Sequence, residues 1–144
     1  DWYPGSLCRA EAFSRNNGSR HLTEAEDDEP LSITSLDLGS NDLDGTMPEE
    51  LALLSSLQVL ILDDNPLLLG SLIANFSTLS SLQHLSARRV GFMGTFPPNL
   101  ETMTQLQSFE LQGDSGMNGA TFPTELWSLP SLNLLSLEGV GVTG

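Results

Sequence analysis

The chain has 144 residues, of which 39% are apolar, and this is enough for a single domain with its own core. It contains 19 acidic residues, five arginines and no lysine, so its formal net charge is −14. This charge disfavours nucleic acid and anionic membrane surfaces as partners, because phosphate binding needs a basic stripe, and the sequence lacks the ~20 continuous apolar residues of a membrane span.

Residues 9–32 form a polar segment that ends in an acidic run, Glu24–Glu29, followed by Pro30. Segments of this length without periodicity are usually functional or disordered, and we expect a solvated insertion. The alternating Asp/Asn spacing of a calcium loop is absent, which disfavours a calcium site. Asn17 and Asn75 each begin an Asn-x-Ser sequon and are predicted glycosylation sites if the chain is secreted.

Residues 33–56 contain two different apolar periods. Leu36 and Leu38 alternate with polar residues, which is the period of a half-buried strand. Leu51 and Leu54 have the three-residue spacing of a short helical turn. This segment is therefore predicted to run as a strand, a turn, an extended stretch and a tight helical segment.

The same pattern returns along the rest of the chain. Gly45 allows a backbone turn that a side chain would resist, and Pro48 keeps the extended stretch out of a central strand. The copies are spaced by 24, 25, 24 and 26 residues and start at Ile33, Leu57, Leu82, Leu106 and Leu132. A fixed period in this range predicts a solenoid in which each unit contacts only its neighbours.

One polar position of the pattern is expected to be buried. Asn41 and Asn65 occupy it in the first two units, where an asparagine can hydrogen-bond to the backbone of the turn. Asp114 can partly imitate this, whereas Val90 and Val140 cannot. Since each lost bond is worth about 1 kcal/mol net, we expect local repacking at the two valines.

The second half of each unit carries the most specific motif, LxGxxP. It reads LDGTMP at 43–48, FMGTFP at 92–97 and GATFP at 119–123, while Ile73 stands where unit two should have proline. With five copies in phase, residues 33–144 resemble the plant-type leucine-rich-repeat family.

The resemblance implies an α/β fold, a right-handed solenoid with a parallel sheet on its concave face and short 3-10 or helical turns on its convex face. It also implies extracellular recognition of proteins, peptides or glycans, as in receptor ectodomains and polygalacturonase-inhibitor-like proteins. No catalysis, cofactor or metal is implied.

Residues 2–8, WYPGSLC, resemble the end of that family's N-terminal cap, WxGVxC, with one extra residue. The resemblance assigns Trp2 to cap packing and pairs Cys8 with a cysteine that would precede Asp1; a buried free thiol is the alternative. We therefore divide the chain into a cap with an acidic insertion, 1–32, and repeats, 33–144. Because it starts inside a cap motif and stops inside a repeat, we expect a segment of a larger protein, with any membrane span outside it.

Alternation along the strands predicts which side chains face the concave surface. Parallel stacking should align them in columns, and the candidate ligand-binding residues are Asp37, Val59, Ile61, Asp63, Asp64, His84, Ser86, Arg88, Arg89, Glu110, Gln112 and Glu138. The two arginines are the only cations of residues 33–144. They are expected either to bind a ligand or to form surface ion pairs, Asp63–Arg88 and Asp64–Arg89.

The predicted function is a non-catalytic recognition module of a larger secreted or cell-surface, receptor-like protein. An inhibitor of a secreted cell-wall-degrading enzyme is the alternative, with the acidic concave face against a basic enzyme. Ice binding, which needs a regular threonine ladder, is disfavoured because Ser71 interrupts the series Thr46, Thr95 and Thr121. No catalytic motif is present.

Trp127 follows Leu126 in the fourth unit and is expected to pack against a neighbouring coil.

Overall fold

The computed structural model describes residues 32–71, 76–113, 117 and 119–143. Trp2, Cys8, Asn17, Asn75 and Asp114, and nearly all of the predicted cap and insertion, lie outside these residues. The repeats form five stacked coils, which we number by their starts at residues 33, 57, 82, 106 and 132.

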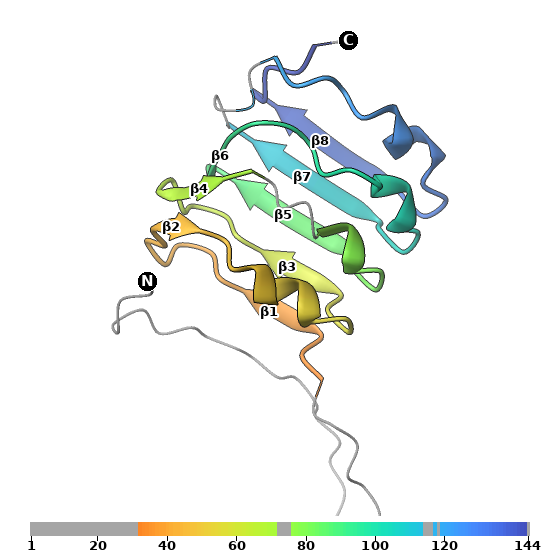
Figure 1. Ribbon diagram of the computed structural model, residues 1–144, viewed down its shortest axis with the longest axis horizontal. Helices are drawn as coiled ribbons and strands as arrows, with labels where there is room; N and C mark the ends of the chain where they lie inside the picture. Colours follow the sequence, from red (N-terminus) through yellow and green to blue (C-terminus); the bar gives the residue numbers. More distant parts are fainter. Residues whose placement is uncertain (1–31, 72–75, 114–116, 118, 144) are drawn as a thin grey trace, which may run out of the picture.

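Each coil contributes one strand to a parallel five-stranded sheet (Figure 1). The strands are adjacent in the order in which they occur along the chain: β1 (Ser35–Asp37), β3 (Val59–Ile61), β5 (His84–Arg88), β7 (Ser108–Gln112) and β8 (Leu134–Glu138). Ser35 lies opposite Val59, Val59 opposite His84, His84 opposite Ser108, and Ser108 opposite Leu134. This register reproduces the spacing of the sequence repeats, so the predicted columns are confirmed.

A second, shorter parallel sheet follows the first turn of the coils. It consists of β2 (Gly45–Thr46), β4 (Leu68–Gly70) and β6 (Gly91–Phe92). The repeat pattern predicted only an extended stretch here, and the structure shows that these stretches pair with one another. In this sheet Thr46 lies opposite Leu69 and not opposite Ser71, which breaks the threonine series further and adds to the case against ice binding.

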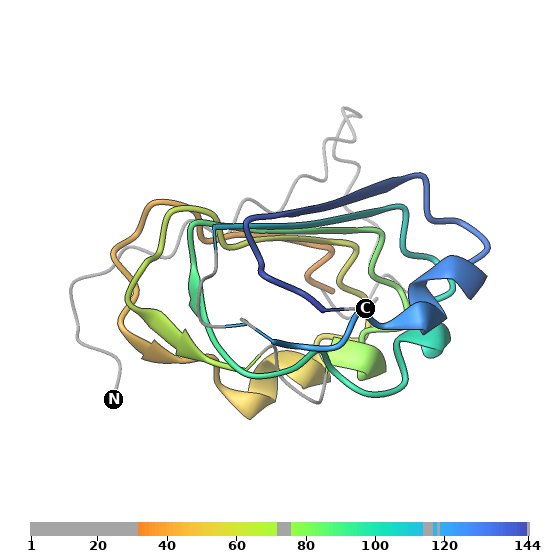
Figure 2. The same ribbon diagram turned by 90° about the horizontal axis from the view of Figure 1, so that it is seen from above.

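Short 3-10 helices close the coils on the side away from the five-stranded sheet (Figure 2). They are η1 (Glu49–Leu53), η2 (Phe76–Thr78), η3 (Leu100–Thr102) and η4 (Thr124–Ser128). A leucine of the pattern is buried in three of them, Leu51, Leu100 and Leu126. The predicted α/β leucine-rich-repeat architecture is therefore confirmed.

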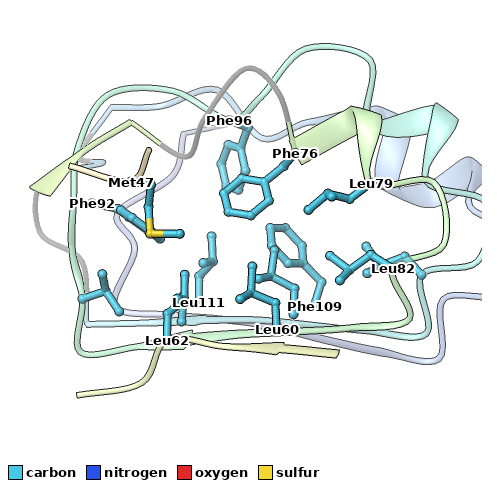
Figure 3. Close-up of a cluster of buried hydrophobic side chains, with 14 of the residues drawn as sticks. Met47, Leu60, Leu62, Phe76, Leu79, Leu82, Phe92, Phe96, Phe109 and Leu111 are labelled. Atoms are coloured by element: carbon cyan, nitrogen blue, oxygen red, sulfur yellow. The ribbon is translucent and has the colours of Figure 1, made fainter. Parts of the chain in front are cut away.

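The apolar positions of the pattern make one continuous core between the sheets and the 3-10 helices (Figure 3). Leu60, Leu85 and Phe109 of the central strands are at most 2% exposed, whereas Leu36 and Leu135 at the two ends of the sheet are partly buried. The Phe96 and Phe109 rings meet edge to face with centroids 6.5 Å apart. Stacking of the coils thus removes the central leucine column from water.

Asn65 closes the turn between coils 1 and 2 from the inside. Its side chain is 0% exposed. The amide nitrogen donates to the carbonyl oxygens of Leu38 and Leu62 at 2.9 and 2.7 Å. The amide oxygen accepts from the backbone nitrogens of Leu43 and Asn41 at 3.0 and 3.2 Å. The predicted role of Asn65 is confirmed.

The other members of that column behave differently. Asn41, predicted to be buried, is only half-buried and donates to the carbonyl oxygen of Gly39 in its own coil at 3.0 Å. Val90 and Val140 are buried in apolar surroundings. Next to Val90, the backbone comes so close to coil 2 that a Cβ on Gly91 would lie 2.5 Å from the carbonyl oxygen of Pro66.

Candidate functional site

We call the outer surface of the five-stranded sheet the sheet face. The strand alternation and the register place all twelve predicted ligand-binding residues on or at the end of this surface, alternating with the side chains that face the core. β5, in the middle of the sheet (Figure 1), supplies His84, Ser86 and Arg88 and is followed directly by Arg89. Neighbouring coils therefore bring residues about 24 positions apart in sequence into contact.

Asp63 does not pair with the Arg88 side chain as predicted. Its Oδ1 instead accepts from the Ser86 hydroxyl at 2.7 Å and from the Arg88 backbone nitrogen at 2.8 Å. The carboxylate thus caps the end of β5 from the preceding coil. The predicted ion pair between Asp63 and the Arg88 side chain is wrong, because Asp63 instead accepts a hydrogen bond from the backbone nitrogen of Arg88.

The Arg88 guanidinium turns the other way and pairs with Glu110 of coil 4. The Ser108 hydroxyl, almost buried, donates to the second oxygen of Glu110 at 3.1 Å. The hydrogen bond from Arg88 lowers the pKa of Glu110 below its usual value; partial burial opposes this, and Ser108 adds to the lowering. Ser108 was not among the predicted site residues, although its register opposite His84 could have indicated it.

Arg89 pairs with Asp64, as predicted. Its Nε and Nη2 both donate to the carboxylate, the second at 2.7 Å. This hydrogen bonding lowers the pKa of Asp64 and raises that of Arg89. The arginine side chain is still 61% exposed, so the ion pair fixes its orientation without covering it.

Arg89 also has an unusual backbone. It is in the left-handed region with φ of 54°, as are Ser40 and Asp64 at the equivalent position of coils 1 and 2. Coils 4 and 5 have glycine there, Gly113 and Gly139, with φ of 82° and 74°. A side chain is disfavoured in this conformation and glycine is not. The two glycines in this column were a sequence signal that the position is left-handed.

The remaining predicted residues complete the border of this surface. Gln112 donates to Glu138 at 2.7 Å, and Asp37 accepts from the backbone nitrogen of Gly39 at 3.0 Å. His84 is exposed, while Val59 and Ile61 are half-buried beside it.

The sheet face is acidic overall. Two arginines oppose five carboxylates, those of Asp37, Asp63, Asp64, Glu110 and Glu138, which leaves three formal negative charges. Each guanidinium donates to one carboxylate. Its remaining N–H groups make no hydrogen bond within the part of the chain that the structure describes. The sheet face thus presents arginine N–H donors in fixed positions, surrounded by carboxylates. Among the described residues, no group of three or more His, Cys, Asp or Glu is arranged to hold a metal.

Trp127 does not pack against a neighbouring coil as predicted. It is 74% exposed on η4 and stacks on Phe122 of its own coil, with ring centroids 5.2 Å apart and planes inclined by 27°.

Sheet, 3-10 turns and repeat spacing together define a leucine-rich-repeat solenoid, a fold class that offers an extended surface for interactions with other proteins. The Leucine Rich Repeat family model matches residues 32–54. Among solved structures, the chain is similar to the LRR ectodomain of the receptor kinase SOBIR1 from Arabidopsis thaliana. The TM-score is 0.59 at 21% sequence identity, over 77% of this chain and 72% of the other.

Within the described residues, no helix combines the length and apolar character needed to cross a membrane.

Proposed function

We propose that this chain is a non-catalytic recognition module that binds a protein, peptide or glycan on its sheet face. We further propose that it belongs to a larger secreted or cell-surface, receptor-like protein. The fold supports recognition, because coil stacking creates a continuous surface from residues of all five repeats. The similar structure, a receptor kinase ectodomain, supports the receptor-like context.

The observation that carries the proposal is the presentation of Arg89. Its backbone is left-handed, where glycine would be more favourable and is found in two other coils. Its ion pair with Asp64 is exposed, and exposed ion pairs contribute little to stability. Stability therefore does not explain an arginine at this position. A role in ligand recognition does explain it.

The arginine pair is suited to recognition in a second respect. Asp64 and Glu110 hold the two guanidiniums from opposite sides, so less side-chain freedom is lost when a ligand binds. Arginine is also enriched among the residues that dominate binding energy at interfaces.

The alternative function is inhibition of a secreted cell-wall-degrading enzyme. It is favoured by the excess of carboxylates on the sheet face, which would attract a basic enzyme at low ionic strength. Loss of hydrolase activity when the protein is added to a basic cell-wall hydrolase would support this alternative. Unchanged activity across a panel of such enzymes would favour the receptor-like function.

The proposal is tested by comparing three forms of the chain as affinity ligands for extracellular fluid of the native host. The wild type and Ser40→Gly should retain the same bound component, because Ser40 has the left-handed backbone but no ion pair. The double variant Arg88→Ala/Arg89→Gly should lose it. Equal retention by all three, with far-ultraviolet circular dichroism confirming that each is folded, would contradict the role of the arginines.

A further inference from the structure

A second exposed feature lies on the other side of the solenoid from the sheet face. The Trp127 indole rests on Phe122, whose ring is partly buried and packs against the core. One face of the indole is therefore backed by a ring anchored in the fold. The rest of the Trp127 side chain is in water, at 74% exposure.

The exposure of Trp127 follows from its place in the repeat. It comes directly after the buried Leu126, as Glu101 comes after the buried Leu100. Glu101 is exposed even though coils flank it on both sides. In coil 3 this position therefore points toward solvent, and Trp127 is a large aromatic residue at the same position of coil 4.

The surroundings of Trp127 are acidic. Glu125 precedes it in η4, and Glu101 lies in η3, which packs against η4. Both glutamates are exposed. The cations of residues 33–144, Arg88 and Arg89, are on the sheet face. No positive side chain from the described part of the chain thus competes for the indole or neutralises its flanking carboxylates.

We propose that Trp127, with Glu101 and Glu125, is a docking site for a basic segment of a partner protein. An arginine or lysine of the partner lies against the free face of the indole, where the quadrupole of the ring attracts a cation, and tryptophan does this best among aromatic residues. The two carboxylates add charge complementarity and steer the approach. Backing by Phe122 keeps the ring in one orientation, which reduces the entropy lost on binding.

This site is separate from the sheet face. Trp127 and Phe122 belong to the part of coil 4 after the turn, whereas Arg88 ends β5 of coil 3 and Arg89 follows it directly. One module can therefore hold a ligand on the sheet and a second protein on the 3-10 helices.

A flat exposed indole also suits the apolar face of a sugar ring, so the test separates a cation from a glycan. The probes are acetyl-(Arg-Gly)4-amide, the same peptide with citrulline in place of arginine, and chitohexaose. Citrulline keeps the shape and most hydrogen-bonding groups of arginine without its charge. Binding is followed through the indole N–H signal of Trp127 in the 15N-labelled chain, assigned by its loss in Trp127→Phe.

The arginine peptide should shift the Trp127 signal, and the citrulline peptide and chitohexaose should not. Trp127→Ala lacks this signal, so its affinity and that of the wild type are compared by isothermal titration calorimetry. The variant should bind the arginine peptide about two- to fivefold more weakly, the range for an exposed cation–aromatic contact. Glu101→Gln/Glu125→Gln should weaken binding as well, with an effect that diminishes as salt is added.

Two controls keep the result specific. Leu53→Ala removes another apolar side chain, 77% exposed on η1, and should leave binding unchanged. In Arg88→Ala/Arg89→Gly the arginine peptide should still shift the Trp127 signal, which separates this site from the proposed function. Equal binding of the citrulline peptide, wild-type affinity in Trp127→Ala, or a signal shifted by chitohexaose alone would overturn the proposal.

Discussion

Two polar networks join neighbouring coils of this protein, and they differ in their access to water. At the turn between coils 1 and 2, the side chain of Asn65 is fully buried and bonds to backbone groups of both coils. On the sheet face, Asp64–Arg89 and Arg88–Glu110 join coils 2, 3 and 4 through ion pairs whose arginines are 61% and 42% exposed. Both networks connect neighbouring coils, but only the Asn65 network is buried away from water.

The difference separates stability from function. A buried polar group that loses its partner is left without water to replace it, so the Asn65 network is required by the fold. An exposed group that loses its partner is hydrated at once, so the ion pairs can be exchanged for contacts with a ligand. Changes to the buried network should therefore destabilise the fold more than changes to the exposed ion pairs.

Asn65→Val should be the most destabilising change. It leaves the backbone nitrogen of Leu43 and the carbonyl oxygen of Leu38 buried without a partner, at a cost on the order of 3 kcal/mol. Urea unfolding followed by circular dichroism measures it. Asn41→Val is the matched control and should cost clearly less, because Asn41 is half-buried and its side chain donates one bond within its own coil. Equal losses would show that burial of Asn65 is not decisive.

Gly91→Ala tests the apolar version of the same turn, next to Val90. The new Cβ would lie 2.5 Å from the carbonyl oxygen of Pro66 and 2.7 Å from Cδ2 of Leu69, so the backbone of coil 2 or 3 must move. We expect a loss of about 1–3 kcal/mol, typical of overpacking, in the same urea titration. Gly39→Ala is the control, since its closest contact is the Asp37 side chain at 3.2 Å. A loss no greater than in Gly39→Ala would mean that the coils can separate at little cost.

Glu110→Gln should have a smaller effect that depends on pH. The folded pKa of Glu110 lies below its usual value, mainly through Arg88, so its stabilising contribution is present above the usual carboxyl pKa and disappears as the pH falls through the folded pKa. The thermal midpoints of wild type and variant should differ most near pH 7 and converge as the pH falls below the usual carboxyl pKa and through the lowered pKa of Glu110. Glu138→Gln serves as control, because Glu138 is exposed and accepts from the neutral Gln112. A constant difference from pH 7 to pH 3 would contradict a role for the Glu110 charge.

Arg89→Gly should change stability least. Loss of the exposed pair with Asp64 is offset by placing glycine in a left-handed conformation that it adopts readily. The thermal midpoint should stay unchanged or rise slightly, as measured by scanning calorimetry. Arg89→Ala, which loses the pair but keeps the backbone strain, should be the less stable of the two. A large drop in Arg89→Gly would assign the arginine to the fold instead of to recognition.

Much of the sheet face could be predicted from the repeat spacing alone. Because parallel strands stack in register, an offset of 24 to 26 residues was enough to place Ser86 beside Ile61 and Gln112 beside Arg88. What the spacing could not predict was the direction of the side chains. Arg88 had carboxylates on both sides, and the choice of Glu110 over Asp63 depended on the backbone nitrogen that Asp63 already binds.

The second sheet and Trp127 show the same limit. The register of β2, β4 and β6 differs by about two residues from the alignment of the repeats, so Thr46 meets Leu69. Trp127 follows a buried leucine in a pattern that does not state which way the next side chain points. The register of the second sheet and the direction of the Trp127 side chain both depend on the backbone conformation of the turns. The period of the sequence does not specify that conformation.

The amino-acid order alone settles that the chain coils, how many coils it makes and which leucines line the core, because apolar side chains at a fixed period have one economical way to leave water. Stacking decides everything that depends on the neighbouring coil. It buries Asn65, leaves Asn41 half-buried, and selects Glu110 as the partner of Arg88. These are contacts between residues far apart in sequence, and their geometry exists only once the coils are packed together.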